Sequence, residues 1–157
     1  MNEINQMAPP LDEDLSKVDT SFPLLADGIY QFKIDEAKVQ PTKDGKGKFI
    51  HLKLSTTMPA ISVKGENLVA GINVFDNRNL VPTGKATWDM IKRGLGEFIQ
   101  AIEGGVSGAT LSGMEQLVPT LQGRTLKAKV GYAPERIDKA TGRQFKANNE
   151  ILLYIKA

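Results

Sequence analysis

The 157-residue sequence contains no cysteine and only one histidine. Without cysteine, the chain cannot form disulfides, build a thiolate zinc site or use a cysteine nucleophile. The single histidine, His51, cannot supply the two ligands of an HExxH zinc site. We therefore expect a chain without metal or cofactor that works in a reducing compartment such as the cytoplasm.

Long apolar runs and catalytic motifs are also missing. No stretch approaches the ~20 residues of a membrane span, and the N-terminal residues lack the basic and apolar pattern of a signal peptide, so we expect no membrane association. Neither GxSxG nor the Walker-type GxxxxGK[ST] occurs. We predict that the protein is not an enzyme. The least favoured alternative is a metal-dependent hydrolase or nuclease that uses Asp35, Glu36 or Asp76.

Charge is distributed unevenly along the chain. Residues 1–21 contain five acidic residues and one lysine, which leaves 13 acidic and 19 basic residues in 22–157. We predict a flexible acidic segment over 1–21 and one domain over 22–157. The segment is either a tail with no task, a mimic of nucleic acid that folds over the basic surface, or a docking site for partner proteins. The basic domain favours an anionic partner.

Residues 27–55 alternate between apolar and polar side chains and predict an antiparallel hairpin. The apolar positions are Tyr30, Phe32 and Ile34 in the first strand and Ile50, Leu52 and Leu54 in the second. The Asp-Gly-Lys-Gly sequence at 44–47 is typical of the turn between them. After Asp35 the phase slips, because Ala37 and Val39 have the opposite parity. Such a slip predicts a β-bulge, which bends a strand as a small closed barrel requires.

Further elements follow along the chain. A third strand is predicted over 66–76, with a bend at Gly71, and a turn over 76–79. A helix is predicted from Trp88 to Ile102, because its apolar residues recur at three- and four-residue spacing. That apolar stripe, which includes Trp88 and Phe98, is expected to pack against the sheet.

The last two predicted strands cover 123–132 and 150–156, separated by a long loop or hairpin tip at 133–149. The order strand, strand, strand, helix, strand, strand predicts a mainly β fold. It matches the five-stranded Greek-key barrel called the OB-fold, with one α-helix between strands three and four. The alternative is an open, sandwich-like sheet with one packed helix.

Positive charge lies near aromatic residues in three segments that an OB barrel would bring together: the tip of the first hairpin, the outward face of strand two, and the loop between strands four and five. Phosphates need cations, and unpaired bases need flat side chains. The candidate phosphate contacts are Lys33, Lys43, Lys46, Lys48, Lys53, Arg136, Lys139, Arg143 and Lys146. The candidate stacking residues are chiefly Phe49 and Phe75, which point away from the apolar faces of their strands, with Phe145 and Tyr154 behind them. Tyr132 shares the parity of apolar Val130, which favours a place in the core or at the barrel rim.

The same residues have plainer interpretations. The lysines are equally typical of solvated turns, and Phe145 of a loop residue that packs onto the barrel. The alternative function is an OB-like interaction or structural module that does not bind nucleic acid.

The order of motifs resembles the small OB-fold single-stranded DNA-binding proteins of tailed bacteriophages, over roughly residues 24–157. The matching motifs are GxYxFxIxxA at 28–37, KxGKG at 43–47, FIHLKL at 49–54, VFDN at 74–77, the helix that begins at Trp88, GRTLKAKV at 123–130 and TGRQFK at 141–146. The resemblance implies sequence-tolerant binding and protection of single-stranded DNA during phage DNA replication or recombination, without a cofactor and in the host bacterial cytoplasm.

One departure from the pattern concerns partners. Proteins of this kind often end in an acidic tail that recruits other proteins, whereas this chain ends on a predicted strand and carries its acidic residues at the N-terminus. Recruitment of replication or recombination proteins therefore stays an open expectation, as does pairing with a second copy through an edge strand.

Overall fold

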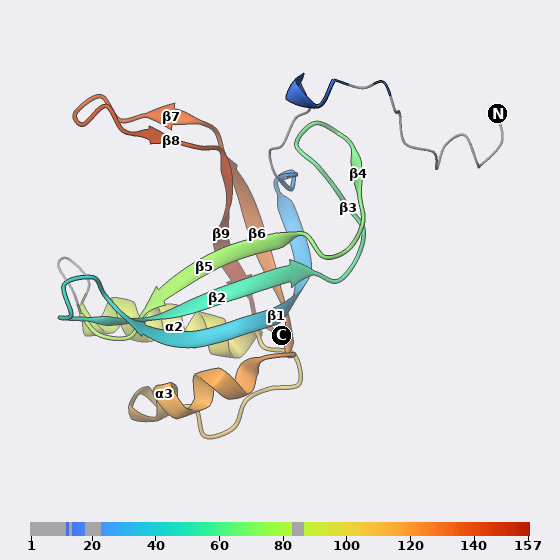
Figure 1. Cartoon of the computed structure of the whole chain (residues 1–157). Helices are drawn as coiled ribbons and strands as arrows, with labels where there is room; N and C mark the ends of the chain where they lie inside the picture. The colour runs from blue at the N-terminus through green and yellow to red at the C-terminus, as the bar shows by residue number, and fades with distance from the viewer. Residues whose placement is uncertain (1–11, 13, 18–22, 83–86) are drawn as a thin grey trace.

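The computed structural model describes residues 12, 14–17, 23–82 and 87–157, so most of the predicted acidic segment lies outside the described residues. The fold is mainly β. One antiparallel sheet has five strands in the order β5-β2-β1-β6-β9 (Figure 1). Its strands are β1 (Gly28–Pro41), β2 (Lys48–Thr56), β5 (Asn73–Asn79), β6 (Thr125–Ala133) and β9 (Asn148–Ile155).

Two short hairpins extend from this sheet. One pairs β3 (Ala60–Ile61) with β4 (Asn67–Leu68), and the other pairs β7 (Arg136–Ile137) with β8 (Gln144–Phe145). The helical elements are η1 (Leu15–Lys17), α2 (Trp88–Ala101), η2 (Leu111–Gly113), α3 (Met114–Leu117) and η3 (Val118–Leu121). Within the described residues, no helix is long and apolar enough to cross a membrane.

The first hairpin and its bulge are confirmed. β1 and β2 pair from Phe32↔Thr56 to Pro41↔Lys48, with a register shift between Ile34 and Glu36. Asp35 is thus the extra residue, and Ile34 and Ala37 are both buried although their parity differs. The bulge lets β1 continue from its pairing with β6 into its pairing with β2 while the core side chains stay inside.

The strand predicted over 66–76 is divided into β4 and the start of β5, and the predicted bend at Gly71 is confirmed, whereas the turn predicted over 76–79 is wrong. The chain leaves β4 at Leu68, bends at Gly71, which has a φ of +101°, and enters β5 only at Asn73. Thr56 holds the bend, because its Oγ1 accepts hydrogen bonds from the backbone N–H groups of Gly71 and Ile72 at 3.1 and 3.0 Å. β5 then runs through the expected turn and pairs with β2 as far as Asn79.

The helix prediction is confirmed over Trp88–Ala101. Thr87 caps its start, since its side chain accepts a hydrogen bond from the backbone N–H of Met90 at 3.3 Å. Leu95 and Phe98 are buried, but the expectation for Trp88 is wrong, because 49% of this residue is exposed. Trp88 belongs to the first turn and lines a surface groove instead of the core.

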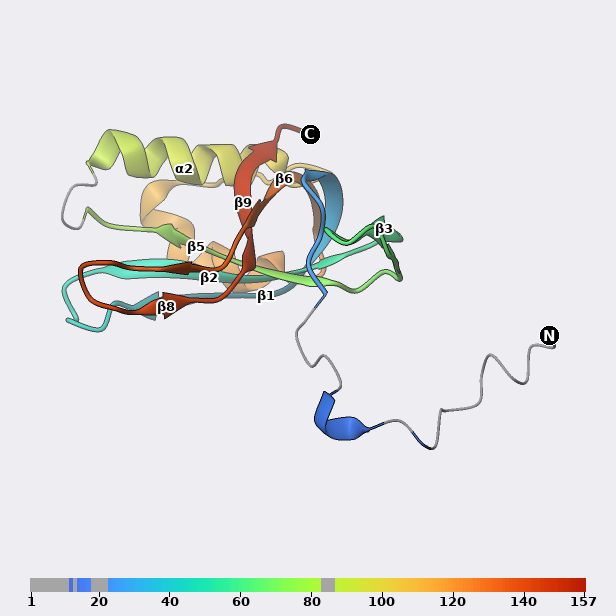
Figure 2. The same ribbon diagram turned by 90° about the horizontal axis from the view of Figure 1, so that it is seen from above.

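The sheet is not closed by backbone pairing, and side chains connect its two edge strands. The Tyr154 hydroxyl of β9 donates to Asp76 Oδ2 of β5 at 2.6 Å, and Arg78 Cζ lies 4.6 Å from the centre of the Tyr154 ring. Glu97 of α2 accepts from the Tyr154 backbone N–H at 2.8 Å and lies 3.7 Å from Arg78. We call these four residues, Asp76, Arg78, Glu97 and Tyr154, the seam cluster. Figure 2 shows α2 running along this side of the sheet.

Candidate nucleic-acid interface

The outward side chains of β1, β2 and β5 form a surface that we call the outer face. Residues directly opposite one another in antiparallel strands point to the same side of the sheet. The backbone register therefore arranges this face in four rows, each crossing β1, β2 and β5 in that order. The rows are Gln40–Phe49–Asn79, Lys38–His51–Asn77, Glu36–Lys53–Phe75 and Lys33–Ser55–Asn73.

Aromatic rings lie on the β2 and β5 part of the outer face. Phe75 is 55% exposed, and its ring stacks on His51 with centroids 5.9 Å apart and planes 23° apart. Phe49 is half-buried on the same face. The predicted outward orientation of Phe49 and Phe75 is confirmed, and the face thus presents flat surface of the kind on which unpaired bases stack.

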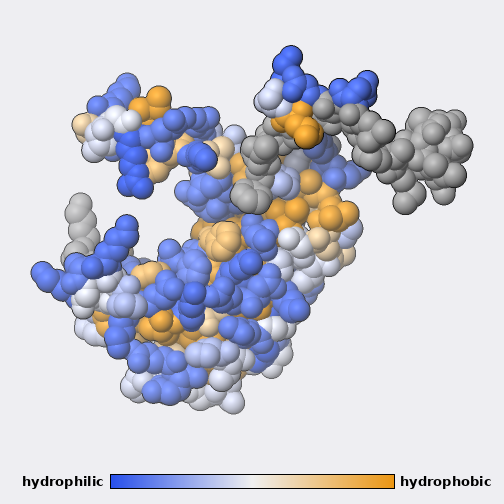
Figure 3. Space-filling view, in the orientation of Figure 1, coloured by the Kyte–Doolittle hydropathy of each residue, from blue (hydrophilic) through white to orange (hydrophobic). Residues whose placement is uncertain are grey.

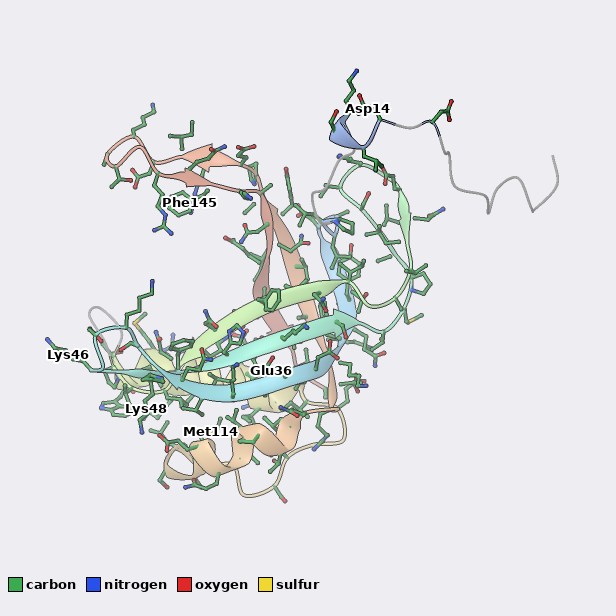
Figure 4. All side chains as sticks on the ribbon, in the orientation of Figure 1. Asp14, Glu36, Lys46, Lys48, Met114 and Phe145 are labelled. Carbon is green, nitrogen blue, oxygen red and sulfur yellow. The ribbon has the colours of Figure 1, made fainter. Side chains whose placement is uncertain are left out.

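Cations lie beside these rings. Lys33 is exposed and Lys53 is half-buried. Lys38 forms an ion pair with Glu36 at 2.7 Å. The hydrogen bond and charge of Lys38 lower the pKa of the Glu36 carboxyl, and the nearby charges of His51 and Lys53 act in the same direction. Glu36 is therefore ionised at neutral pH. Figure 4 shows that it lies on the middle strands of the sheet.

The loop between β1 and β2 carries exposed Lys43 and Lys46. Asp44 fixes this turn by accepting from the Thr42 hydroxyl at 2.6 Å and from the Lys46 backbone N–H at 3.0 Å. These two hydrogen bonds lower the pKa of the Asp44 carboxyl. Gly45 has a φ of +72°, which glycine adopts without strain. The turn is thus ordered, and both lysines project from its tip.

The segment over residues 134–147, which includes β7 and β8, is here called the basic hairpin. Arg136 lies directly opposite Phe145, so both side chains share one side of the hairpin. The guanidinium carbons of Arg136 and Arg143 lie 4.9 and 5.1 Å from the Phe145 ring centre. Two cations thus lie against one aromatic ring, while Lys139 and Lys146 are exposed nearby.

The basic hairpin and the outer face border a cleft. The hairpin projects above the sheet, and its tip extends to the same side of the molecule as the β1–β2 turn (Figure 1, Figure 2). The space-filling view is hollowed between the hairpin and the body below it (Figure 3). Phe145 lies on the side of the hairpin that faces the sheet (Figure 4). The cleft therefore has aromatic and cationic groups on both walls.

Two predicted site residues do not lie in this cleft. Lys48 has the parity of buried Ile50, and it forms an ion pair with Glu115 of α3 on the other side of the sheet. Tyr154 is only 2% exposed and belongs to the seam cluster, so its ring cannot stack on a base. The reason is a register shift in β9 between Ile151 and Leu153, which reverses the parity read from the sequence.

The seam also determines the protonation of Tyr154. Burial, followed by the charge of Asp76, raises the pKa of the Tyr154 hydroxyl well above its usual value. The hydroxyl is therefore a hydrogen-bond donor over the whole physiological pH range.

Tyr132, which was expected in the core or at the rim, is 39% exposed near the end of β6.

Sequence reasoning missed the amides of β5. Asn77 lies beside His51, with 2.9 Å between Asn77 Oδ1 and His51 Nδ1, and Asn73 and Asn79 are exposed on the same side of the strand. The sequence did contain a signal, because inward positions continue at every second residue from Val74 through Asp76 to Arg78. The sequence Asp-Asn-Arg-Asn is typical of a turn and concealed this strand pattern.

The carboxylates considered for metal chemistry are dispersed. Glu36 pairs with Lys38, and Asp76 accepts hydrogen bonds from Tyr154 and Arg78. In the parts of the chain that the structure describes, no group of three or more His, Asp or Glu side chains could hold a metal ion.

Comparison with protein-family models and with curated protein sequences finds no match for this chain. The case for a function therefore depends on the geometry of the cleft.

Proposed function

We propose that the protein binds and protects single-stranded DNA, with little sequence specificity, in the cleft between the outer face and the basic hairpin. The observation that carries this proposal is the pairing of aromatic rings with cations on both walls: Phe75 and His51 beside lysines below, and Phe145 in contact with two arginines above. A single strand offers unstacked bases and regularly spaced phosphates. The aromatic rings of the cleft would contact the bases while its cations contact the phosphates.

We further propose that the five long strands form an OB-type barrel. Numbered along the chain, their order in the sheet is 3-2-1-4-5, and pairing of the third strand with the fifth would complete the ring. The seam cluster supports this assignment, because it joins those two strands, β5 and β9, through side chains. A role in phage DNA replication or recombination belongs to the same proposal.

Fluorescence anisotropy of a labelled ~30-mer tests the proposal. We expect tight binding to single-stranded DNA, much weaker binding to the duplex, and a steep dependence on salt. If about five phosphates are neutralised, the slope of log K against log salt is near −3.5, at ~0.7 per contact. An RNA strand of the same sequence measures the preference for DNA.

Charge reversal of Arg136 and Arg143 to Glu provides the matched variant, because both side chains belong to the basic hairpin and neither is in the core. We expect it to abolish binding while the circular dichroism spectrum and melting temperature stay the same. No binding by the wild-type protein at low salt would contradict the proposal and favour the alternative, a protein-interaction module.

A further inference from the structure

The outer face has a charged part on β1 and β2 and a neutral part on β5. Among the described residues, the outward charges of the face lie on β1 and β2, where they are Lys33, Asp35, Glu36, Lys38 and Lys53. The outward residues of β5 are Asn73, Phe75, Asn77 and Asn79, so within the described structure this column carries no charge. The charge of Glu36 is balanced by Lys38 at 2.7 Å, which leaves the charged part with a positive balance.

The basic hairpin lies above the same charged part. Seen from above, it covers β1 and β2, whereas most of β5 lies to one side of it (Figure 2). Figure 1 shows the hairpin on the side of the sheet opposite α3. Arg136 and Arg143 therefore add their charge over the lysine-bearing strands and not over the amides.

A single strand has the same kind of asymmetry. Its phosphates run along one edge and its bases project from the other. Phosphates gain most where cations lie on both sides of them, and bases gain most over exposed rings and neutral hydrogen-bonding groups.

We propose that single-stranded nucleic acid lies in the cleft with its sugar–phosphate backbone over β1 and β2, beneath the basic hairpin, and with its bases over β5. Phe75 and Asn77, followed by Asn79, contact the bases, whereas Lys33 and Lys53 contact phosphates. This inference rests on the proposed function and adds an orientation to it.

Asn77 is positioned for base contact by His51. In the tautomer with a proton on Nδ1, His51 donates to Asn77 Oδ1 across 2.9 Å. The amide is then held in one orientation, and its Nδ2 group is left to donate to a base carbonyl or ring nitrogen. Because every base offers such an acceptor, this contact contributes affinity with only a modest preference among bases.

The decisive probe is an abasic oligonucleotide, which keeps the sugar–phosphate backbone and lacks the bases. Affinities for it and for a normal strand of equal length are measured by anisotropy at several salt concentrations. The variants are Phe75→Ala and Asn77→Ala on β5 and Lys53→Gln on β2. The matched controls are Asn67→Ala, on the distant β3–β4 hairpin, and Lys92→Gln, an exposed lysine of α2.

We expect Asn77→Ala to weaken binding of the normal strand about threefold to tenfold, as for one hydrogen bond, and Phe75→Ala to weaken it by tenfold or more. Neither variant changes the affinity for the abasic strand. Lys53→Gln weakens both strands equally and reduces the magnitude of the salt slope by ~0.7. The two control variants have the same affinity as the wild-type protein for both strands.

The opposite pattern would overturn the inference. If the β5 variants weaken the abasic and normal strands alike, or if Lys53→Gln affects only the normal strand, the strand does not lie in the proposed orientation although it binds. If the wild-type protein binds neither strand, the proposed function itself fails, and the orientation fails with it.

Discussion

At the scale of single residues, Glu36 is the side chain that opposes the proposed function. Its carboxylate lies at the centre of the outer face and occupies Lys38 in an ion pair. An anion there repels phosphates, and its lowered pKa keeps it charged at any pH at which the protein would encounter DNA.

We therefore predict that Glu36→Gln strengthens binding to single-stranded DNA severalfold at low salt. The substitution removes one negative charge and frees Lys38 for a phosphate, so the salt slope steepens by ~0.7. Anisotropy titrations at four salt concentrations measure both effects. Glu66→Gln on the β3–β4 hairpin is the control, because this exposed carboxylate lies far from the cleft. Unchanged or weaker binding of the Glu36 variant would show that phosphates do not pass near Glu36.

A second residue-scale prediction concerns Thr56, a buried polar residue that is 4% exposed. Thr56→Val keeps the shape of the side chain but leaves the Ile72 backbone N–H without its acceptor. We expect a loss of about 1–2 kcal/mol in the free energy of unfolding, measured by urea denaturation. Thr125→Val on β6 is the comparison, because this half-buried threonine makes no side-chain hydrogen bond to any described residue. An equal loss in both variants would argue against this explanation.

At the scale of elements, the seam cluster takes the place of a ladder between β5 and β9. Tyr154→Phe removes the hydroxyl that donates to Asp76 at 2.6 Å. We predict a loss of about 1–3 kcal/mol in the free energy of unfolding at neutral pH, since the acceptor is a carboxylate in a low-dielectric site. Because the ring is buried, DNA affinity should not change. A large loss of affinity with normal stability would mean that Tyr154 reaches the cleft.

The pH dependence of the same variant follows from the raised pKa of Tyr154. The folded protein holds the hydroxyl proton above pH 10, where an unfolded tyrosine releases it. The stability that this raised pKa contributes is complete below pH 10 and is lost as pH rises toward the folded value. We therefore expect the stability difference between wild-type protein and Tyr154→Phe to shrink above pH 10. A constant difference up to pH 11 would contradict the assignment of the hydroxyl as donor.

The elements differ in how far sequence alone could predict them. β1, β2 and α2 have strict periodicity, so their faces and even the bulge at Asp35 are visible in the sequence. β5 is different, because its inward residues Asp76 and Arg78 are polar and look like a turn. Their partners, Tyr154 and Glu97, lie far along the chain, and no local pattern indicates such a contact.

The candidate site shows the same limit. The alternation of inward and outward positions along a strand correctly predicted that Phe49 and Phe75 point outward. The same alternation could have predicted that Lys48 points inward, because it has the parity of Ile50. It failed for Tyr154 because the register shift in β9 is a tertiary effect with no signal in the apolar run Ile151–Tyr154. The roles of these residues in binding remain predictions.

At the scale of the whole molecule, the basic hairpin is continuous with the ends of β6 and β9. Among the described residues, its hydrogen bonds lie within the hairpin itself, such as those from Asp138 N–H to Arg143 and from Gly142 N–H to Asp138. None of its residues belongs to the core of the described structure, so we expect the fold to survive its removal.

We predict that replacing residues 134–147 by a two-residue Asn-Gly turn leaves the melting temperature nearly unchanged, because this turn suits two paired strands. Single-stranded DNA should bind far more weakly, with a salt slope reduced in magnitude by about 2 to 3 for the four cations lost. Thermal unfolding and anisotropy measure the two effects. Wild-type affinity in the shortened protein would remove this hairpin from the binding site.

The bulge at Asp35 has a consequence for how the gene can vary. The Asp35 side chain is exposed and forms no ion pair with any of the described residues, so a mutational library should tolerate nearly any amino acid other than proline there. Loss of that one codon is a different event. It would leave a strictly alternating strand in which Phe32, Ile34 and Ala37 keep their inward positions, but it would remove the bulge that bends β1 between its pairing with β6 and its pairing with β2. At position 35 we therefore expect most substitutions to be tolerated but a deletion to be harmful. Deletion scanning would reveal this constraint, which substitution scanning cannot detect.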